Sequence, residues 1–317
     1  MSVWLLTNPS ADVHHAPGHP ERPERRAAAA EGVRAAAGAQ LVEPAIQPAT
    51  EADLARVHDP AYLATLEQAD SRGGGWLDPD TYLAPGSVGA ARDAAGATLQ
   101  AALAAAMGEA DVAFAAVRPP GHHAGRQGGR GFCLVNNVAV AAAGLRARGL
   151  AGRVAIIDWD VHHGDGTQAI YDDDPDVCYA STHQAPFYPG TGWPEEAGSG
   201  DAAGTMHNRP LAADSGDQAF VEAWQGLLAV IELFGPDAIL VSAGYDAHAD
   251  DPLAGLAVTE AGYESVARLV GELSLRLGLG GIALTLEGGY DLEALRASTA
   301  ATVRGLLAGR SASGAGA

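Results

Sequence analysis

Residues 155–168 of the chain read AIIDWDVHHGDGTQ. An apolar run with the composition of a buried strand passes directly into a cluster of aspartate and histidine side chains. Such crowding costs desolvation and charge repulsion unless a cation or hydrogen-bond partners bind these groups. In an extended segment every second side chain points the same way, so Asp158, Asp160 and His162 would share one side of the chain. The stretch therefore predicts a strand that carries a polar, cation-binding cluster at its carboxyl end.

Apolar runs of this kind recur along the chain and are separated by longer Ala- and Leu-rich segments. The expected strands cover residues 3–6, 112–117, 153–158, 177–181, 238–244 and 282–287. The expected helices lie near residues 22–37, 87–107, 136–149, 217–234, 259–277 and 291–307. Near-continuous apolar strands that alternate with helices are typical of a parallel sheet covered on both faces. We therefore expect a single α/β domain over residues 1–308 and a flexible tail over residues 309–317.

Polar clusters follow four of the expected strands. They are RPPGHHAG (118–125), DWDVHHGDG (158–166), YDAHADDP (245–252) and GGYD (288–291). In open α/β sheets the ligand crevice lies beyond the carboxyl ends of the strands. The four clusters are distant in sequence, but we expect them to converge at this edge of the sheet.

Composition narrows the classes of partner. The chain has 19 Lys and Arg residues against 39 Asp and Glu residues, a formal net charge of −20. This balance argues against nucleic acid, whose phosphates bind basic residues, and would suit a cationic partner or simply solubility. Apolar stretches are broken by Arg, Gly or Asp, so we expect no membrane span. The first ten residues hold too short an apolar run for a signal peptide.

The cysteine content points to the compartment. Only Cys133 and Cys178 are present, which excludes a disulfide framework and fits a reducing, cytoplasmic location. The oligomeric state is left open by the sequence, and a homo-oligomer is compatible with it.

Asp160 and His162 could together grip one metal ion, with Asp246 at another strand end as the third ligand. Two carboxylates and one imidazole suit Zn²⁺, and Fe²⁺, Co²⁺ or Mn²⁺ also fit such a set. The alternative is that Asp158 and Asp160 cap the following turn while His162 binds the backbone.

His122 and His123 follow a Pro-Pro-Gly turn and could act beside the metal. Asp158 and Asp165 are spare carboxylates that could each hold the far nitrogen of one imidazole, which fixes its tautomer and raises its basicity. A pair held in this way suits general acid and base catalysis. The alternative is that both are ordinary loop histidines.

Aromatic side chains are expected near the same edge. Tyr290 follows Gly288 and Gly289, whose freedom to turn could aim the phenol into the crevice, where its O–H could stabilise an oxyanion. Phe132 and Tyr188 could wall a narrow apolar channel. The alternative is that all three aromatic residues only pack the core.

Together these motifs resemble the histone deacetylase superfamily, in particular its class II-like bacterial deacetylases. The matching stretches are residues 18–26, 118–125, 131–137, 158–168, 187–192, 242–253 and 286–291. They occur in the family's order and span nearly the whole chain. The resemblance implies a single-domain arginase/deacetylase-type α/β fold and Zn²⁺-dependent amide hydrolysis.

The resemblance also implies a role for each matching residue. The metal ligands would be Asp160, His162 and Asp246. His123 would be the general base and acid, and His122 its electrostatic partner. Asp158 would pair with His122, and Asp165 with His123. Tyr290 would polarise the acyl carbonyl. The acyl-lysine tunnel would be lined by Gly131, Phe132, Tyr188 and Leu253. A structural K⁺ would be held by Asp158 and Ser181 with backbone carbonyls of Asp160, His162 and Thr182.

Some positions depart from the family's common pattern. Asp165 stands where many class II-like members have Asn, and we expect the carboxylate to raise the basicity of His123 more than an amide would. Leu253 stands where a subgroup specialised for acetylated polyamines has Glu, which weakens that reading. Asp78 and Asp80 are expected to contact the substrate backbone. The loops near residues 71–80 and 193–208 are expected to control access.

We therefore expect a deacylase that acts on acylated lysine in peptides or proteins or on small acylated amines. One alternative is an acetylpolyamine amidohydrolase. A non-catalytic acyl-lysine binding protein is less compatible with the complete set of His122, His123 and Tyr290. An arginase-like ureohydrolase would need a two-manganese cluster, which the single DxDxHH arrangement does not favour.

Overall fold

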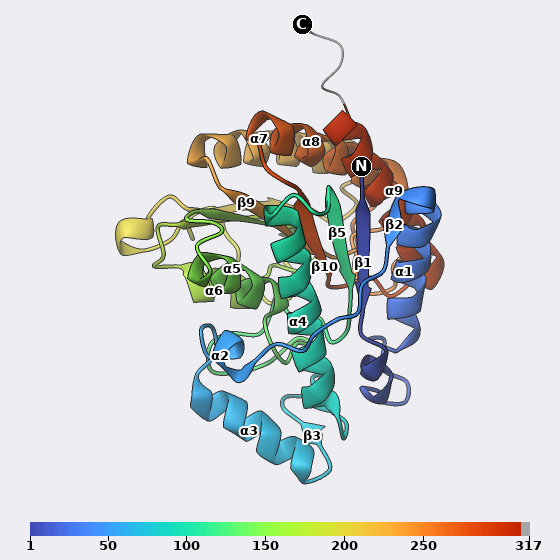
Figure 1. Ribbon diagram of the computed structural model, residues 1–317, viewed down its shortest axis with the longest axis vertical. Coiled ribbons are helices and arrows are strands. Elements are labelled where there is room, and N and C mark those ends of the chain that lie inside the picture. The colour runs from blue at the N-terminus through green and yellow to red at the C-terminus, as the bar shows by residue number, and fades with distance from the viewer. Residues whose placement is uncertain (312–317) are drawn as a thin grey trace, which may run out of the picture.

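Eight parallel strands form the central sheet of the protein, whose computed structural model describes residues 1–311 (Figure 1). The strand order is β2-β1-β5-β10-β9-β6-β7-β8. The strands are β1 (Val3–Thr7), β2 (Leu41–Val42), β5 (Val112–Ala116), β6 (Val154–Asp158), β7 (Val177–Gln184), β8 (Met206–Leu211), β9 (Ala238–Ala243) and β10 (Ile282–Leu286). A separate antiparallel pair joins β3 (Gly75–Trp76) to β4 (Tyr82–Leu83). Because the eight strands are parallel, their carboxyl ends share one edge.

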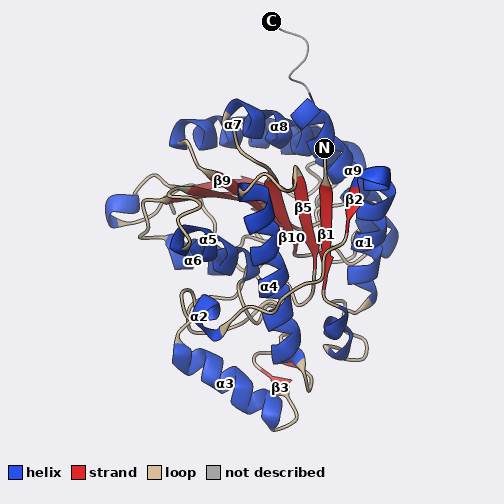
Figure 2. Ribbon diagram, viewed as in Figure 1, coloured by secondary structure: helices blue, strands red, loops and turns tan. Residues whose placement is uncertain are grey.

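Helices cover both faces of the sheet (Figure 2). One face packs on α1 (Glu24–Ala37), α7 (Asp217–Phe234), α8 (Glu260–Arg276) and α9 (Leu292–Ser311). The other packs on α2 (Glu51–Leu54), α3 (Pro60–Ser71), α4 (Ser87–Ala106), α5 (Asn137–Ala147) and α6 (Asp165–Tyr171). Side chains alternate between the two faces along each strand. Phe114 of β5 therefore packs against the helices of the first face, and Ala115 against those of the second. The predicted α/β class is confirmed.

The sequence located the six central strands and six of the helices, namely α1, α4, α5, α7, α8 and α9, but it missed the remaining elements. These are β2, β8, α2, α3, α6, the antiparallel pair and the 3-10 segments at Pro9–Val13, Gly38–Gln40 and Gly200–Ala202. Strand β8 reads MHNRPL and lies at the edge of the sheet, where half-exposed polar residues replace the apolar run expected of a strand.

The last helix is longer than expected. The predicted tail over 309–317 is wrong at its start, because α9 continues through Ser311. Arg310 holds this end of the helix: its guanidinium donates to the Gly280 carbonyl at 2.7 Å and to Ser274 Oγ at 2.8 Å. Residues 312–317 lie outside the described part of the chain.

Glycine allows the outer helices to touch at backbone distance. A Cβ on Gly32 of α1 would overlap with Thr299 of α9, and a Cβ on Gly305 of α9 would overlap with the carbonyl oxygen of Glu264 in α8. The high Ala and Gly content therefore serves close packing of the helices.

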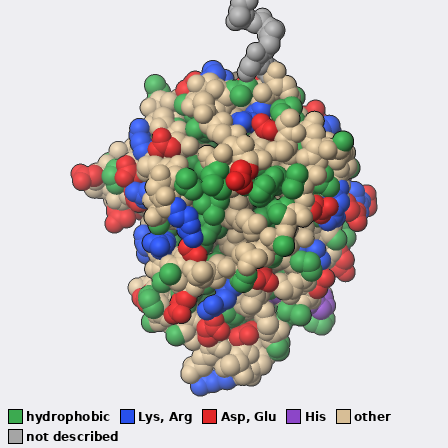
Figure 3. All heavy atoms as spheres, in the orientation of Figure 1, with side chains coloured by type: hydrophobic (Ala, Val, Ile, Leu, Met, Phe, Trp, Pro, Cys, Tyr) green, Lys and Arg blue, Asp and Glu red, His purple; other side chains and the backbone are tan. Residues whose placement is uncertain are grey.

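The face seen in Figure 3 carries acidic, basic and apolar side chains in an interspersed pattern. Among the residues that the structure describes, no helix is both long and apolar enough to cross a membrane.

A buried ion-pair network ties the N-terminal segment to the sheet. Glu21, Arg25 and Arg118 are all fully buried. Arg118 donates to Glu21 Oε2 at 2.6 Å, and Arg25 donates to Glu21 Oε1 at 3.0 Å. Burial alone would raise the pKa of Glu21, but the two guanidinium groups outweigh it and lower this pKa to about 2.

We predict that Glu21→Gln destabilises the protein by about 3 kcal/mol or more at neutral pH, because two buried guanidinium groups lose their anionic partner. The pKa of Glu21 is lower in the folded chain than its ordinary value of 4.5, so its contribution to stability is complete above about pH 4.5 and is lost as the pH falls towards 2. Urea unfolding of both proteins over this pH range measures the difference.

Glu31→Gln is the matched control, because Glu31 pairs with Arg296 on the exposed surface, where an ion pair contributes about 1 kcal/mol or less. Equal effects of the two substitutions at pH 7 would contradict the assignment.

Candidate active site

The four polar clusters meet where the carboxyl ends of the central strands lie. They follow β5, β10, β9 and β6, which are consecutive neighbours in the strand order. Segments far apart in sequence thus lie side by side: Val112 of β5 pairs with Ile282 of β10, and the labels of these two strands are adjacent in Figure 1. The site is built on strand ends and the turns that follow them.

Asp160, His162 and Asp246 form a compact donor set, with one ligand atom from each within 4.8 Å of the others. His162 Nδ1 lies 3.0 Å from Asp160 Oδ1 and 3.2 Å from Asp246 Oδ2. The far oxygens are anchored, since Gly288 N donates to Asp160 Oδ2 at 2.7 Å and Val161 N donates to Asp246 Oδ1 at 2.9 Å. Asp246 Oδ2 is buried without a hydrogen-bond partner among the described residues. The donors present therefore fit a divalent cation.

The charges within this set are strongly perturbed. Burial would lower the pKa of His162, but Asp160 and Asp246 raise it to about 10. Burial, followed by the charge of Asp160, raises the pKa of Asp246. Without a metal ion, a proton on His162 compensates the two carboxylates. A divalent ion would displace that proton, because a ligating imidazole nitrogen must be unprotonated.

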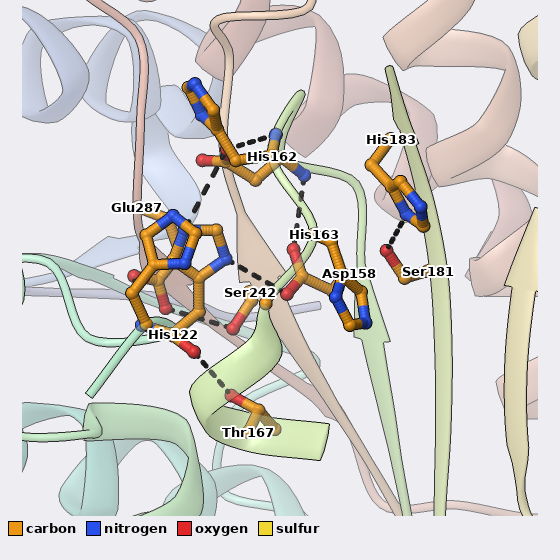
Figure 4. Close-up of polar contacts among 12 residues, drawn as sticks. His122, Asp158, His162, His163, Thr167, Ser181, His183, Ser242 and Glu287 are labelled. Atoms are coloured by element: carbon orange, nitrogen blue, oxygen red, sulfur yellow. Dashed lines mark hydrogen bonds and ion pairs between the residues drawn. The ribbon is translucent and has the colours of Figure 1, made fainter. Parts of the chain in front are cut away.

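A second group of possible donors, His122, Cys133 and Glu287, lies nearby. Glu287 is fully buried and accepts hydrogen bonds from Gly121 N at 2.6 Å, His122 N at 3.1 Å and Ser242 Oγ at 2.9 Å. Burial above all raises the pKa of Glu287 to about 7. No oxygen of this group is orphaned in the described part of the chain, so Glu287 serves to fix the histidine loop to β9 and β10 (Figure 4). The sequence contained Glu287 within LEGGYD but gave no sign of this contact.

His122 is paired with Asp158, as the sequence predicted, with Nδ1 at 3.1 Å from Asp158 Oδ2 (Figure 4). Tyr179 Oη donates to the same carboxylate oxygen at 2.9 Å. Burial opposes protonation of His122, but the charges of Asp160 and Asp158 raise its pKa well above the ordinary value. The neighbouring carboxylates therefore favour the positively charged form of His122.

His123 is paired with Asp165, as the sequence also predicted, with Nδ1 at 2.7 Å from Asp165 Oδ1. Burial and the neighbouring charge of His122 lower the pKa of His123 to about 3, against the opposing effect of Asp165. Arg130, a residue that the sequence did not single out, forms an ion pair with Asp165 while half of its side chain stays exposed. The expected gain in basicity from Asp165 is reduced, because Arg130 shares the carboxylate.

Tyr290 is buried and faces the same cavity. The Arg25 guanidinium lies 4.7 Å from the centre of the Tyr290 ring, and Arg25 Nε donates to the Gly289 carbonyl at 2.5 Å. Burial raises the pKa of Tyr290 well above the ordinary value, so the phenol keeps its proton. Arg25 thus links the N-terminal ion-pair network to the turn that carries Tyr290.

One cavity of about 240 Å³ connects these groups to the surface. It is lined by Asp80, Pro120, His122, His123, Gly131, Phe132, His162, Phe187, Tyr188, Leu253, Gly288 and Tyr290. All four tunnel residues expected from the resemblance are among them, together with Asp80. Phe187 was missed, although its ring stacks on His162 with centroids 5.4 Å apart. Gly131 is required as glycine, because a Cβ there would come within 2.5 Å of His123 Cδ2 and its φ is +54°.

Two buried histidines hold the segment that carries Tyr188. His183 Nε2 lies 2.9 Å from the Gly192 carbonyl oxygen, and His163 Nδ1 lies 2.8 Å from Thr191 Oγ1. His183 also contacts Ser181 Oγ at 2.9 Å (Figure 4). The loop predicted to control access is therefore fixed at its start to strand β7, through His183, and to the segment after β6, through His163.

The residues expected to hold K⁺ are also adjacent. Asp158 of β6 lies opposite Ser181 of β7 in the parallel register. Thr182 Oγ1 is buried without a hydrogen-bond partner among the described residues. Binding of K⁺ at this place stays a prediction.

Comparison with known proteins agrees with this geometry. Residues 19–306 match the histone deacetylase domain. A probable deacetylase of Archaeoglobus fulgidus is 41% identical over 283 residues, which cover 87% of this chain and 78% of that protein. A histone deacetylase-like amidohydrolase of Pseudomonas aeruginosa is 40% identical over 246 residues, which cover 77% and 65% respectively.

A solved structure shares the fold. The crystal structure titled HDA15 HD domain superposes with a TM-score of 0.90 at 36% identity, covering 98% of this chain and 90% of that one. The arginase/deacetylase-type fold predicted from the sequence is confirmed, and the chain belongs to the histone deacetylase family.

Proposed function

We propose that the protein is a metal-dependent deacylase that hydrolyses the amide bond of N-acetyl-lysine in peptides and proteins or of small acylated amines. The observation that carries this proposal is the orphaned Asp246 Oδ2 facing His162 at the cavity, beside two paired imidazoles. Membership of a family of deacetylases and amidohydrolases supports it.

Asp160, His162 and Asp246 would hold one ion per chain, for which we propose Zn²⁺, with Fe²⁺ as the alternative. When bound, such an ion polarises the acyl carbonyl and the attacking water. A structural K⁺ near Asp158 and Ser181 is a separate part of the proposal.

The protein's own groups would move the protons. His123 is neutral at physiological pH because of its lowered pKa, so it can take a proton from the attacking water. Asp165 fixes the ring by accepting the Nδ1–H, which leaves Nε2 as the basic atom. His123 then returns the proton to the departing amine. His122, whose charged form Asp158 favours, would stabilise developing negative charge, and the Tyr290 O–H would donate to the oxyanion.

The cavity wall suits an uncharged acyl chain on a lysine-like stem. Phe132 and Tyr188 supply aromatic surface, and Leu253 adds an aliphatic one. A polyamine substrate would present an additional ammonium group, for which Leu253 offers no charge. Asp80 also lines the cavity and could bind such a group, so an acetylpolyamine is the second candidate substrate.

We also propose a cytoplasmic location, because both thiols, Cys133 and Cys178, are free and buried, which is compatible with a reducing compartment. The acidic surface charge disfavours nucleic acid as a partner.

We predict that a strong chelator abolishes hydrolysis of an acetyl-lysine peptide and that Zn²⁺ or Fe²⁺ restores it. The ion should also raise the melting temperature, because it relieves the repulsion between Asp160 and Asp246. Elemental analysis of the active protein measures the ion directly. Full activity in metal-free protein would exclude the proposed function.

We predict that His123→Ala and Tyr290→Phe each lower kcat by about a hundredfold or more, since each removes a group that acts on the reacting atoms. A hydroxamate inhibitor should still bind both variants, because the metal ligands remain. Tyr263→Phe is the control, as its hydroxyl is buried without a partner among the described residues. Near-normal turnover in either variant would contradict these roles.

Equal turnover of acetylspermidine and the peptide would favour the second candidate substrate.

We predict opposite pH shifts for two substitutions around His123. Asp165→Asn removes the anion that favours the imidazolium, so the acid limb of the log(kcat/KM) profile moves to lower pH. Arg130→Gln frees the full charge of Asp165, which raises the pKa of His123 and moves the limb to higher pH. Arg209→Gln, at an exposed position, should leave the profile unchanged. Shifts in the same direction would contradict the pairing.

A further inference from the structure

Asp251 is a buried carboxylate that the proposed chemistry does not use. Its Oδ2 accepts a hydrogen bond from Tyr290 N at 2.6 Å and a longer one from Asp291 N at 3.3 Å. Its Oδ1 accepts from Leu253 N at 3.0 Å. Tyr290 and Leu253 both line the cavity, so one carboxylate is bonded to the backbone of two of its walls.

No basic side chain forms an ion pair with Asp251 in the part of the chain that the structure describes. Only 7% of the residue is exposed. A buried carboxylate without a cationic partner costs desolvation free energy. Burial and then the charge of Asp246 raise the pKa of Asp251, and the backbone N–H groups of Tyr290, Leu253 and Asp291 oppose that rise. Hydrogen bonds from backbone N–H groups offset this desolvation cost. The carboxylate therefore serves to hold the backbone segments that carry these groups.

Asp251 holds the peptide unit between Gly289 and Tyr290. Its carbonyl oxygen accepts from Arg25 Nε at 2.5 Å, while its N–H donates to Asp251 at 2.6 Å. A buried cation thus faces the negative end of the peptide dipole, and a buried anion faces the positive end. The two contacts fix the peptide plane from both sides, and this plane sets the direction in which the Tyr290 side chain leaves the backbone.

The turn needs such fixing because it is built from glycine. A Cβ on Gly288 would overlap with the carboxylates of Asp246 and Asp160, so this position must be glycine. Gly289 has φ +115°, a region that residues with a side chain rarely adopt. Two consecutive glycines leave the backbone ahead of Tyr290 with few conformational restraints of its own.

We propose that Asp251 is a positioning residue that holds the Tyr290 phenol and the Leu253 wall at the cavity through the backbone N–H groups of both residues. This inference rests on the proposed deacylase function. The carboxylate is needed as such, because it offers an acceptor oxygen to each wall. An asparagine would offer one acceptor and one donor, so it would lose the contact to either Tyr290 or Leu253.

The test compares Asp251→Asn with wild-type protein in zinc-loaded form on an acetyl-lysine peptide. We expect kcat to fall about 10- to 100-fold, with a smaller change in KM, since small misplacements of a catalytic group act on turnover. Metal content and hydroxamate binding should be retained. Asp250→Asn is the matched control, because this neighbouring side chain is 78% exposed.

A double-mutant cycle separates positioning from general stability. In a Tyr290→Phe background, Asp251→Asn should cause a much smaller further loss of kcat than in wild type, because the Tyr290 hydroxyl is already gone and only the Leu253 wall remains to be displaced. Full additivity, or wild-type kcat in Asp251→Asn, would overturn the inference. Asp251→Glu keeps both acceptor oxygens and should retain more activity than Asp251→Asn; it also serves where the asparagine variant fails to fold.

The proposed deacylase function and the positioning role of Asp251 can be tested separately. If wild-type protein hydrolyses no acylated amine, the proposed function fails, and crystal structures of wild type and Asp251→Asn still decide the positioning role. The Tyr290 ring should leave its wild-type place in the variant. An unmoved Tyr290 would overturn the inference independently of activity.

Discussion

Asp160, His162 and Asp246 place two carboxylates and an imidazole so close together that the surrounding chain must make room for them. A Cβ on Gly244 would overlap with the Asp160 carboxylate, and a Cβ on Gly288 would overlap with that of Asp246. Each glycine directly follows or nearly follows the end of a sheet strand, β9 or β10. This set of three donors therefore constrains the strand ends themselves. Gly288, together with Gly289, also makes the turn to Tyr290 compliant, which is why further contacts are needed to fix that residue.

The two adjacent histidines show how one dipeptide acquires two different charges. His122 lies against Asp158, with Asp160 nearby, and these anions raise its pKa. His123 has one carboxylate partner, which Arg130 partly neutralises, and it lies beside the charge of His122. Burial penalises both imidazolium forms, so the balance of neighbours decides between them. A charged and a neutral imidazole can then serve electrostatic and proton-transfer roles at neighbouring positions.

The sequence was sufficient for those parts of the fold and site that follow from local pattern. The central strands are apolar runs, and the paired groups, Asp158 with His122 and Asp165 with His123, lie in clusters that parallel strands bring to one edge. Strand β8 was missed because an edge strand with polar residues has no apolar run. Glu287 and Arg130 were missed because their importance comes from contacts with distant segments.

The Glu21 network illustrates the same limit more strongly. Glu21 and Arg118 are 97 positions apart in sequence, and each would be expected at the surface on composition alone. Arginine suits these buried positions because its planar fork can bond several acceptors at once. Arg25 contacts Glu21 on one side and the Gly289 carbonyl on the other. Arg25 thereby joins the buried ion-pair network to the turn that presents Tyr290. A substitution at Glu21 would therefore disturb the cavity as well as the fold, although Glu21 does not line the cavity.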